Sequence, residues 1–341
     1  MSTIRDVANL ANVSIATVSR VLNNDTKYKM TDETRIKVLQ AATQLNYKAA
    51  NSKIKNHSSN GENTTLNNNI KIGCVLSVTK SKYNDPYFMS ILSGLESQLL
   101  DYGYEISFIK TGPELYDTKQ LYNTFNVPVT GLILMESLNN ETYEFIRKQV
   151  PNIVGIDTQH EDIDNVGYDH YNAAKLAVQY LTEKGHKEIG YIGGSSINEN
   201  IKESQRYKGF YSTMHVSGLS VNPDWVIDCE WDEKLCTQKV DYLCKMKNCP
   251  TAFFVGSDLM AMAALSSFSN NGFVVPNAMA VVGLSNIEVS KFSNPPLTTI
   301  DIPTTEIGMV AADLLIARIN GYNLLPKKVI LPTSLIVRNS A

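Results

Sequence analysis

The chain has 341 residues, a formal net charge of −3 and 43% hydrophobic residues, which is typical of a globular protein with two or three domains. No apolar run approaches the ~20 residues of a membrane helix, and no apolar signal segment opens the chain, so we expect a cytoplasmic protein without a membrane role. Five cysteines without a Cys-x-x-Cys pair and five histidines without an H-x-H or H-x-x-x-H pair predict reduced thiols and no metal site.

The charge is unevenly distributed. Residues 1–60 hold nine Lys and Arg and four Asp and Glu, a balance of +5, so the remainder carries 22 minus 30, or −8. A basic N-terminal module on an acidic body is typical of a DNA-binding protein with a separate regulatory domain. Alone, such a charge run is more often a solvated surface.

The first 23 residues predict two short helices joined by a turn at residues 11–13. Apolar residues of the first helix recur at spacings of three and four, and Thr3 precedes them as N-cap. Ser14 is the expected N-cap of the second helix, which spans residues 15–23. Its outer face carries small, hydroxylated or cationic side chains that suit a DNA groove: Ile15, Ala16, Ser19 and Arg20.

The string TIRDVANLANVSIATVSRVLN resembles the start of the LacI/GalR family of bacterial transcriptional repressors at nearly every fixed position of the family pattern. The alternative is an ordinary helical hairpin. The resemblance implies a λ-repressor-like helix–turn–helix head that binds double-stranded operator DNA. The DNA-binding residues that it implies are Thr3, Ser14, Ile15, Ala16, Thr17, Ser19, Arg20, Asn23, Thr31, Thr34 and Tyr47.

A third helix is expected from Thr31, its N-cap, to about residue 46. Four apolar residues are available to close a three-helix core: Ile36, Leu39, Ala42 and Leu45. Cationic and aromatic side chains beside it are expected along the phosphate backbone: Lys27, Tyr28, Lys29 and Lys37.

Residues 48–69 are rich in Asn, Ser and Thr and predict a hinge and linker. In the family, the segment equivalent to residues 48–56 is a hinge helix that inserts a leucine into the minor groove. Here Asn56 stands at the leucine position and Ala49 replaces the usual proline, so Ile54 is the nearest apolar candidate for the hinge. A looser tether between the two domains is the open alternative.

From residue 70 strand and helix patterns alternate, which predicts an α/β fold of two doubly wound parallel-sheet subdomains. The expected strands are residues 71–78, 104–109, 131–135, 152–156, 188–194, 226–231, 251–257, 278–285, 297–300 and 328–337. The expected helices lie at 86–102, 171–185, 206–214, 233–246, 258–271 and 304–320. Ligands of such folds bind at the carboxyl ends of the strands.

The segments GHKEIGYIGG, PTAFFVGSDLMAMAAL and PPLTTI resemble the periplasmic-binding-protein-like core of the same family, with the greatest similarity to Gram-positive galactose and β-galactosidase operon repressors. The expected domains are residues 1–47 for DNA binding, 48–69 for the hinge and linker, and 70–341 for effector binding and dimerisation. Within the core, the N-subdomain is expected at about 70–158 and 298–324, and the C-subdomain at about 159–297 and 325–341.

A sugar site needs polar side chains for hydroxyl groups and an aromatic face for the ring. The resemblance places Arg206 at a ligand-binding arginine and Trp231, the end of its expected strand, at a stacking aromatic position. Alternatives are a surface ion pair for Arg206, core packing for Trp231 and a helix N-cap for Asp258. The full set of candidate effector-binding residues is Arg206, Trp231, Ser257, Asp258, Asn286, Ser285, Asp157, Tyr87 and Asp85.

The function that these features predict is a repressor of a sugar-utilisation operon. It binds a palindromic operator as a homodimer, with a tetramer possible, and a small sugar, a galactoside, releases it. A corepressor-dependent repressor or an activator stays open, as does a sugar-binding or sugar-metabolising protein without a DNA role. No cofactor is expected, and an enzyme is disfavoured because dinucleotide, P-loop and G-x-S-x-G motifs are missing from the sequence.

Overall fold

The computed structural model of the chain describes residues 3–22, 30–31, 34, 37–38, 41, 45, 70–78, 82–195 and 200–341. By its contacts the chain divides into two compact units, residues 1–63 and 64–341. The domain boundaries expected at residues 47 and 69 lie outside the described residues and stay predictions. Among the described helices, none is long and apolar enough to cross a membrane.

The head contains the two predicted N-terminal helices, α1 (Ile4–Leu10) and α2 (Ile15–Leu22). Thr3 caps α1 in a capping box: its hydroxyl accepts from the Asp6 amide at 3.3 Å, and the Asp6 carboxylate accepts from the Thr3 amide at 2.7 Å. The Ser14 hydroxyl accepts from the Thr17 amide at 3.1 Å at the start of α2. Both predicted N-caps are therefore confirmed.

A small apolar core closes the head. Its members come from α1, α2 and the region of the third helix: Val7, Ala8, Ala11, Val18, Val21, Val38 and Ala41, with Leu45 packed against them. Residues 38, 41 and 45 are spaced as on one face of a helix, and the side chains of that face close the core. Leu45 was expected there, whereas Ile36, Leu39 and Ala42 lie outside the residues whose side chains are described.

The second unit contains two six-stranded sheets among its described residues. The first has the order β11 (Lys328–Leu331), β5 (Asp164–Tyr168), β4 (Asn152–Ile156), β3 (Gly131–Met135), β1 (Ile72–Leu76) and β2 (Ile106–Thr111). The second has the order β12 (Ser334–Ile336), β10 (Thr298–Asp301), β9 (Ala280–Ser285), β8 (Ala252–Val255), β6 (Ile189–Gly193) and β7 (Val226–Asp228). All pairs are parallel except β10 with β12. The predicted pair of parallel-sheet subdomains is confirmed, with one antiparallel edge strand.

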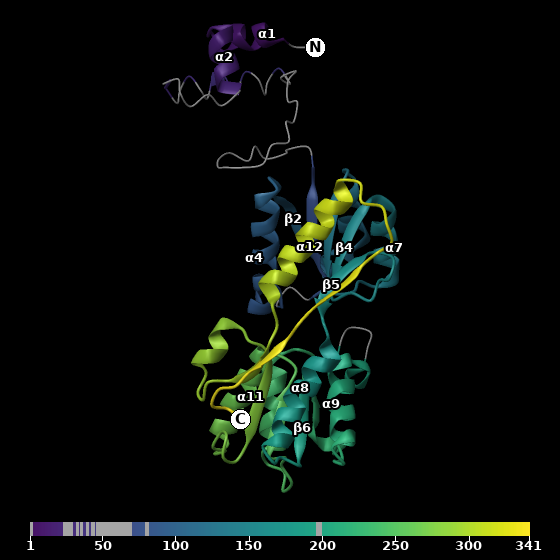
Figure 1. Ribbon diagram of the computed structural model, residues 1–341, viewed down its shortest axis with the longest axis vertical. Helices are drawn as coiled ribbons and strands as arrows, with labels where there is room; N and C mark the ends of the chain where they lie inside the picture. The colour runs from purple at the N-terminus through teal and green to yellow at the C-terminus, as the bar shows by residue number, and fades with distance from the viewer. Residues whose placement is uncertain are drawn as a thin grey trace. The chain divides into compact units, whose positions relative to one another are not determined.

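Helices cover each sheet, and Figure 1 shows the two resulting lobes. Those of the first lobe are α4 (Pro86–Asp101), α5 (Gly112–Leu115), α6 (Thr118–Phe125), α7 (Asn140–Gln149) and α12 (Thr304–Ile319). Those of the second are α8 (His170–Glu183), α9 (Gln205–Val216), α10 (Glu233–Leu243) and α11 (Asp258–Asn270). Short 3-10 turns are η1 (Lys82–Asn84), η2 (Ile201–Glu203), η3 (Pro223–Trp225) and η4 (Glu288–Phe292).

Helices α4 and α12 pack with their backbones in close approach. A Cβ added at Gly94 would lie 2.0 Å from the Thr305 carbonyl oxygen, and one added at Gly308 would lie 2.1 Å from the Ile91 carbonyl oxygen. Real Cβ atoms do not come this close, so glycine at both positions is what lets the two helices, distant in sequence, cover one face of the first sheet together.

Three strands belong to a different sheet from the one that the expected subdomain boundaries imply. β5 pairs with β4, and β11 pairs with β5, so residues 164–168 and 328–331 belong to the first sheet. β10 pairs with β9, so residues 298–301 belong to the second. The expected boundaries are wrong at these points, because backbone hydrogen bonds decide which sheet a strand joins: β5 and β10 each pair with the strand before them, and β11 pairs with the distant β5.

The chain crosses between the two lobes three times within residues 82–341. The crossings lie between β5 and α8, between β10 and α12, and between β11 and β12. The third crossing was not expected, because residues 328–337 were predicted to form a single strand. In Figure 1 the C-terminal segment runs from one lobe into the other. These crossings bring residues of both lobes into contact.

Candidate functional site

The carboxylate of Asp157, just after β4, is the centre of a polar group that involves both lobes. Tyr87, in the first turn of α4, donates its hydroxyl to Oδ2 of Asp157 at 3.1 Å. His170 Nε2, at the start of α8, lies 3.1 Å from Oδ1 of Asp157. Burial opposes the charge on Asp157, but His170, Arg206 and Tyr87 outweigh it and hold the pKa of Asp157 below its usual value.

Arg206 joins this group from α9. Its Nε and Nη2 atoms donate to the Tyr168 hydroxyl at 3.2 and 2.9 Å. The Tyr168 ring in turn stacks on His170, with centroids 4.0 Å apart. The alternative of a surface ion pair for Arg206 is wrong, because its hydrogen bonds go to a buried tyrosine in the interior of the group.

Trp231 lies beside the guanidinium of Arg206, whose Cζ is 5.2 Å from the indole centroid. Lys82 Nζ, from η1 of the first lobe, is 5.3 Å from the same centroid. A Cβ at Gly194 would come within 2.5 Å of the indole Cγ, so only glycine admits the ring at this place. The group therefore combines an aromatic ring, two cations and a carboxylate, the residue types that a sugar site uses.

Trp231 was expected to end its strand, and that expectation is wrong. β7 ends at Asp228, and Glu230 and Trp231 follow with φ of +50° and +57°. The Asp228 carboxylate accepts from the amides of Ser195 and Glu230, both at 3.0 Å. The bond to Glu230 closes a turn after the strand, the bond to Ser195 ties this turn to the end of β6, and the indole that follows lies beside Arg206.

Ser257 and Asp258 have structural roles in the second lobe. The Ser257 hydroxyl caps α11 by accepting from the Met260 amide at 3.3 Å, so the proposed N-cap role of Asp258 is wrong. Asp258 is fully buried and accepts from the Thr299 hydroxyl at 2.6 Å and from the Ile287 amide at 3.0 Å. Burial raises the pKa of Asp258 to about 6 against these bonds.

Ser285 ends β9 and Asn286 follows it, with φ of +122° and +52°. The Asn286 side chain donates to Asp301 at 2.7 Å and accepts from Arg338 at 2.6 Å. This network joins β9, the end of β10 and the C-terminal segment beside two of the lobe crossings. The described hydrogen bonds of Asn286 thus brace the crossings and do not connect it to Arg206 or Trp231.

Several residues of the polar group were missed in the sequence. Tyr168 and His170 flank the first lobe crossing: Tyr168 ends β5 and His170 begins α8. Strand β5 was not predicted because Asp, Asn and Gly are poor strand formers. The Tyr191 hydroxyl is fully buried without a hydrogen bond of good geometry to a described residue. Asp85, which was predicted, caps α4 by accepting from the Tyr87 amide at 2.9 Å.

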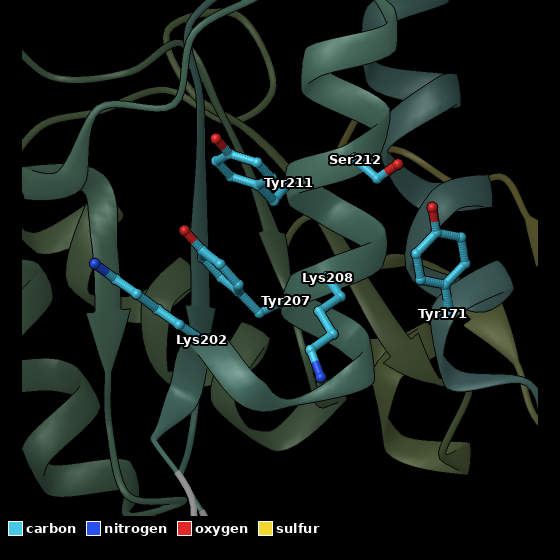
Figure 2. A pocket seen from close by; sticks show the side chains of 6 residues that line it. All are labelled: Tyr171, Lys202, Tyr207, Lys208, Tyr211 and Ser212. Atoms are coloured by element: carbon cyan, nitrogen blue, oxygen red, sulfur yellow. The ribbon is translucent and has the colours of Figure 1, made fainter.

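A separate hollow of about 590 Å³ lies on the second lobe. Figure 2 shows its lining side chains, which come from α8, η2 and α9: Tyr171, Lys202, Tyr207, Lys208, Tyr211 and Ser212. Tyr171 and Tyr211 are 37% and 50% exposed. Small-molecule sites bury most of their ligand, and a hollow with such exposed walls does not. None of the predicted effector residues lines it.

The outer face of α2 carries the predicted DNA-contacting side chains. Ile15, Ala16 and Ser14 are exposed, with Ile15 at 41%, whereas Val18 on the opposite face is buried. Thr31 and Thr34 share a hydrogen bond of 2.9 Å between their hydroxyls, and the Thr34 amide donates to Thr31 at 3.3 Å. Asn23, Tyr47 and Ile54, also predicted, lie outside the described residues.

Comparison with known proteins finds relatives over the whole chain. A model of the bacterial regulatory proteins of the lacI family matches residues 3–49, and one of a periplasmic binding protein-like domain matches residues 178–341. The HTH-type transcriptional repressor PurR of Aliivibrio salmonicida is 33% identical over 328 residues, 94% of this chain and 92% of its own length. The HTH-type transcriptional repressor MelR of Bacillus subtilis is 30% identical over 351 residues, 100% of this chain and 97% of its own length.

Solved structures share the fold. The transcriptional regulator CelR–cellobiose complex has a TM-score of 0.72 at 24% identity and covers 100% of both chains. The lac repressor dimer bound to operator and the anti-inducer ONPF has a TM-score of 0.72 at 22% identity and covers 99% of this chain and 98% of its own. At these identities the likeness establishes the architecture of a helix–turn–helix head with two α/β lobes.

Proposed function

This chain belongs to the lacI family of bacterial regulatory proteins, DNA-binding transcriptional repressors, and from that premise we propose that it represses a sugar-utilisation operon and is released by a sugar. The sugar, a galactoside, binds at the group formed by Arg206, Trp231, Asp157 and Tyr87. The head binds a palindromic operator as part of a homodimer in the cytoplasm.

The observation that supports the site most strongly is the convergence of Arg206 and Trp231 from the second lobe with Asp157 and Tyr87 from the first. A ligand that bonds to both sides changes the free energy of the lobe arrangement. Only a ligand with different affinities for two arrangements can shift the equilibrium between them. A site shared by two lobes can meet that requirement, because a change in the lobe arrangement changes the contacts that the ligand makes.

A dimer follows from the size of the DNA-contacting surface. One α2 helix presents few side chains, too few for the ~10⁻⁸–10⁻¹¹ M affinities of specific DNA-binding proteins. Two heads on a palindrome double the contacts. The solved lac repressor complex is a dimer on its operator, which supports the same assembly here.

The test is an operator-binding titration on the DNA upstream of the protein's own gene cluster, with and without galactose, lactose and a raffinose-type sugar. We expect one sugar to weaken operator binding about 5–150-fold, the usual range of coupling between two sites. Trp231→Ala should keep the operator affinity and lose the sugar response. An unchanged sugar response in that variant would remove Trp231 from the site.

The sign of the effect distinguishes two modes of regulation. Tighter operator binding with sugar would make this a corepressor-dependent repressor. Intact operator binding with no response to any of these sugars would contradict the galactoside assignment.

A further inference from the structure

Lys82 is placed against the effector site from the opposite lobe. It belongs to η1, which follows the first strand of the first sheet, whereas Trp231 follows β7 of the second sheet. Its ammonium nitrogen is 5.3 Å from the indole centroid, within the ~6 Å range of a cation–π interaction. No motif of the sequence pointed to this residue.

The charges around Lys82 come from both lobes. Glu136 and Asp85 in the first lobe and Glu233 in the second attract the ammonium, and Arg206 repels it. Burial lowers the pKa of Lys82 to about 8, which leaves the side chain mostly protonated at neutral pH. The ring of Trp231 therefore has a charged partner from across the lobes.

The two cations at Trp231 are held very differently. Arg206 is fixed by two hydrogen bonds to the Tyr168 hydroxyl. The Lys82 ammonium makes no ion pair within 4.0 Å and no hydrogen bond with any residue that the structure describes, and it lies 5.3 Å from the indole centroid. Of the two, Lys82 is the one whose side chain can leave the indole without breaking a hydrogen bond to a described residue.

We propose that Lys82 is an internal competitor of the effector: its ammonium occupies the indole of Trp231 in the sugar-free protein, and a sugar ring displaces it in order to stack there. The proposal rests on the proposed function in one respect, that Trp231 is the stacking residue. Because Lys82 and Trp231 belong to different lobes, the contact also links the lobes, and a sugar that displaces it removes that link.

The contact between Lys82 and Trp231 can be tested without any ligand. The chain has two tryptophans, and Trp225→Phe leaves Trp231 as the sole fluorophore. In that background Lys82→Ala should increase quenching of Trp231 by acrylamide, a neutral quencher, and Lys82→Arg should leave it unchanged. Lys184→Ala is the matched control, because Lys184 lies 5.3 Å from the Tyr180 ring in the same kind of contact away from the site. Should Trp225→Phe fail to fold, the same comparison uses the parent protein, since Trp225 is 8% exposed.

Competition is tested by sugar titrations of the same proteins with galactose, lactose and a raffinose-type sugar, followed by Trp231 emission. Loss of the cation–π contact should tighten sugar binding by Lys82→Ala about two- to fivefold, and Lys82→Arg and Lys184→Ala should bind like the parent. Unchanged acrylamide quenching, or unchanged or weaker sugar binding in Lys82→Ala, would overturn the proposal.

The two proposals fail in different ways. If the parent protein shows no emission change and no operator release with any of these sugars, the proposed function is wrong. The acrylamide comparison then still decides whether Lys82 covers Trp231. If sugars release the parent protein but Lys82→Ala responds at the same concentrations, only the role of Lys82 is wrong.

Discussion

The charge state of the buried carboxyl group of Asp258 depends on its surroundings in the fold. Asp258 has no solvent contact, and its two oxygens accept from Thr299 and from the Ile287 amide. Burial nevertheless raises the pKa of Asp258 to about 6, because neutral donors only partly replace water. Its position at the first turn of α11 suggested a ligand contact or a cap, and the structure makes it a core residue that fixes η4 and β10.

The pH dependence of folding should report this residue. The folded pKa of Asp258 lies above its unfolded value of 3.8, so the folded protein binds the extra proton, and its contribution to stability is lost as pH rises from about 4 through 6. The free energy of unfolding of the parent, minus that of Asp258→Asn, should therefore fall by about 2 kcal/mol between pH 4 and pH 7. Urea unfolding at a series of pH values measures it. A difference that stays constant or rises with pH would contradict the assignment.

At the scale of elements, one buried ion pair connects three of them. Arg318 near the end of α12 donates to both oxygens of Asp164 at 2.7 and 2.8 Å, where β5 begins. The same carboxylate accepts from the Lys327 amide at 2.7 Å just before β11. Asp164 is 1% exposed, and together these bonds hold β11 and α12 at the edge of the first sheet.

Breaking this pair should destabilise the protein strongly. Arg318→Met leaves the buried Asp164 carboxylate without its cation, which costs about 3–5 kcal/mol of unfolding free energy. The matched control is Arg147→Met, which breaks the exposed pair of Arg147 and Asp162 at 2.9 Å and should cost at most about 1 kcal/mol. Urea unfolding measures both free energies. Equal losses of unfolding free energy in the two variants would show that water reaches the Asp164 carboxylate in the folded protein.

Helix α2 contains Arg20, the cationic candidate for a contact to a DNA base. If Arg20 bonds to a base with both of its terminal nitrogens, Arg20→Ala should cost at least about 1–3 kcal/mol on the operator and much less on random DNA. Arg5→Ala on α1 is the matched control, expected to weaken binding to both DNAs alike if it contacts only phosphate. Fluorescence anisotropy with labelled duplexes measures both. The same loss for Arg20→Ala on both DNAs would make Arg20 a phosphate contact.

For the whole molecule, the decisive property is the coupling between the two units. The balance of +5 in residues 1–60 and −8 in the remainder separates DNA binding from sugar binding in sequence. The proposed effector site is built from both lobes of the second unit, and three chain crossings join those lobes. In the function proposed above, a sugar-dependent change in the lobes is the physical route by which the head is controlled.

This coupling must be reciprocal. If a sugar weakens operator binding by a given factor, saturating operator DNA must weaken sugar binding by the same factor, because the two affinities share one thermodynamic cycle. Isothermal titration of the sugar, with and without operator duplex, provides the comparison with the operator titration. Unequal factors at one salt concentration would show an additional state, such as a change in oligomerisation.

Local chemistry was the most predictable part of this protein. Thr3, Ser14 and Thr31 act as helix caps in the structure as the sequence indicated, because capping depends on a side chain and an amide three residues away. Strands β3 and β4 have the predicted bounds, since buried parallel strands are continuous apolar runs. The grouping of Arg206 with Trp231 was predicted through the family resemblance and not from spacing.

What the sequence by itself determined was the family, the helix–turn–helix with its caps, and the alternation of strands and helices, all of which depend on neighbouring residues. Only the tertiary structure decided which sheet β5, β10 and β11 join, that Asp258 is buried, and that Lys82 faces Trp231. The physical reason is that these features depend on hydrogen-bond partners and ring contacts from segments far away in the chain. Such partners leave no periodic pattern in the residues on either side.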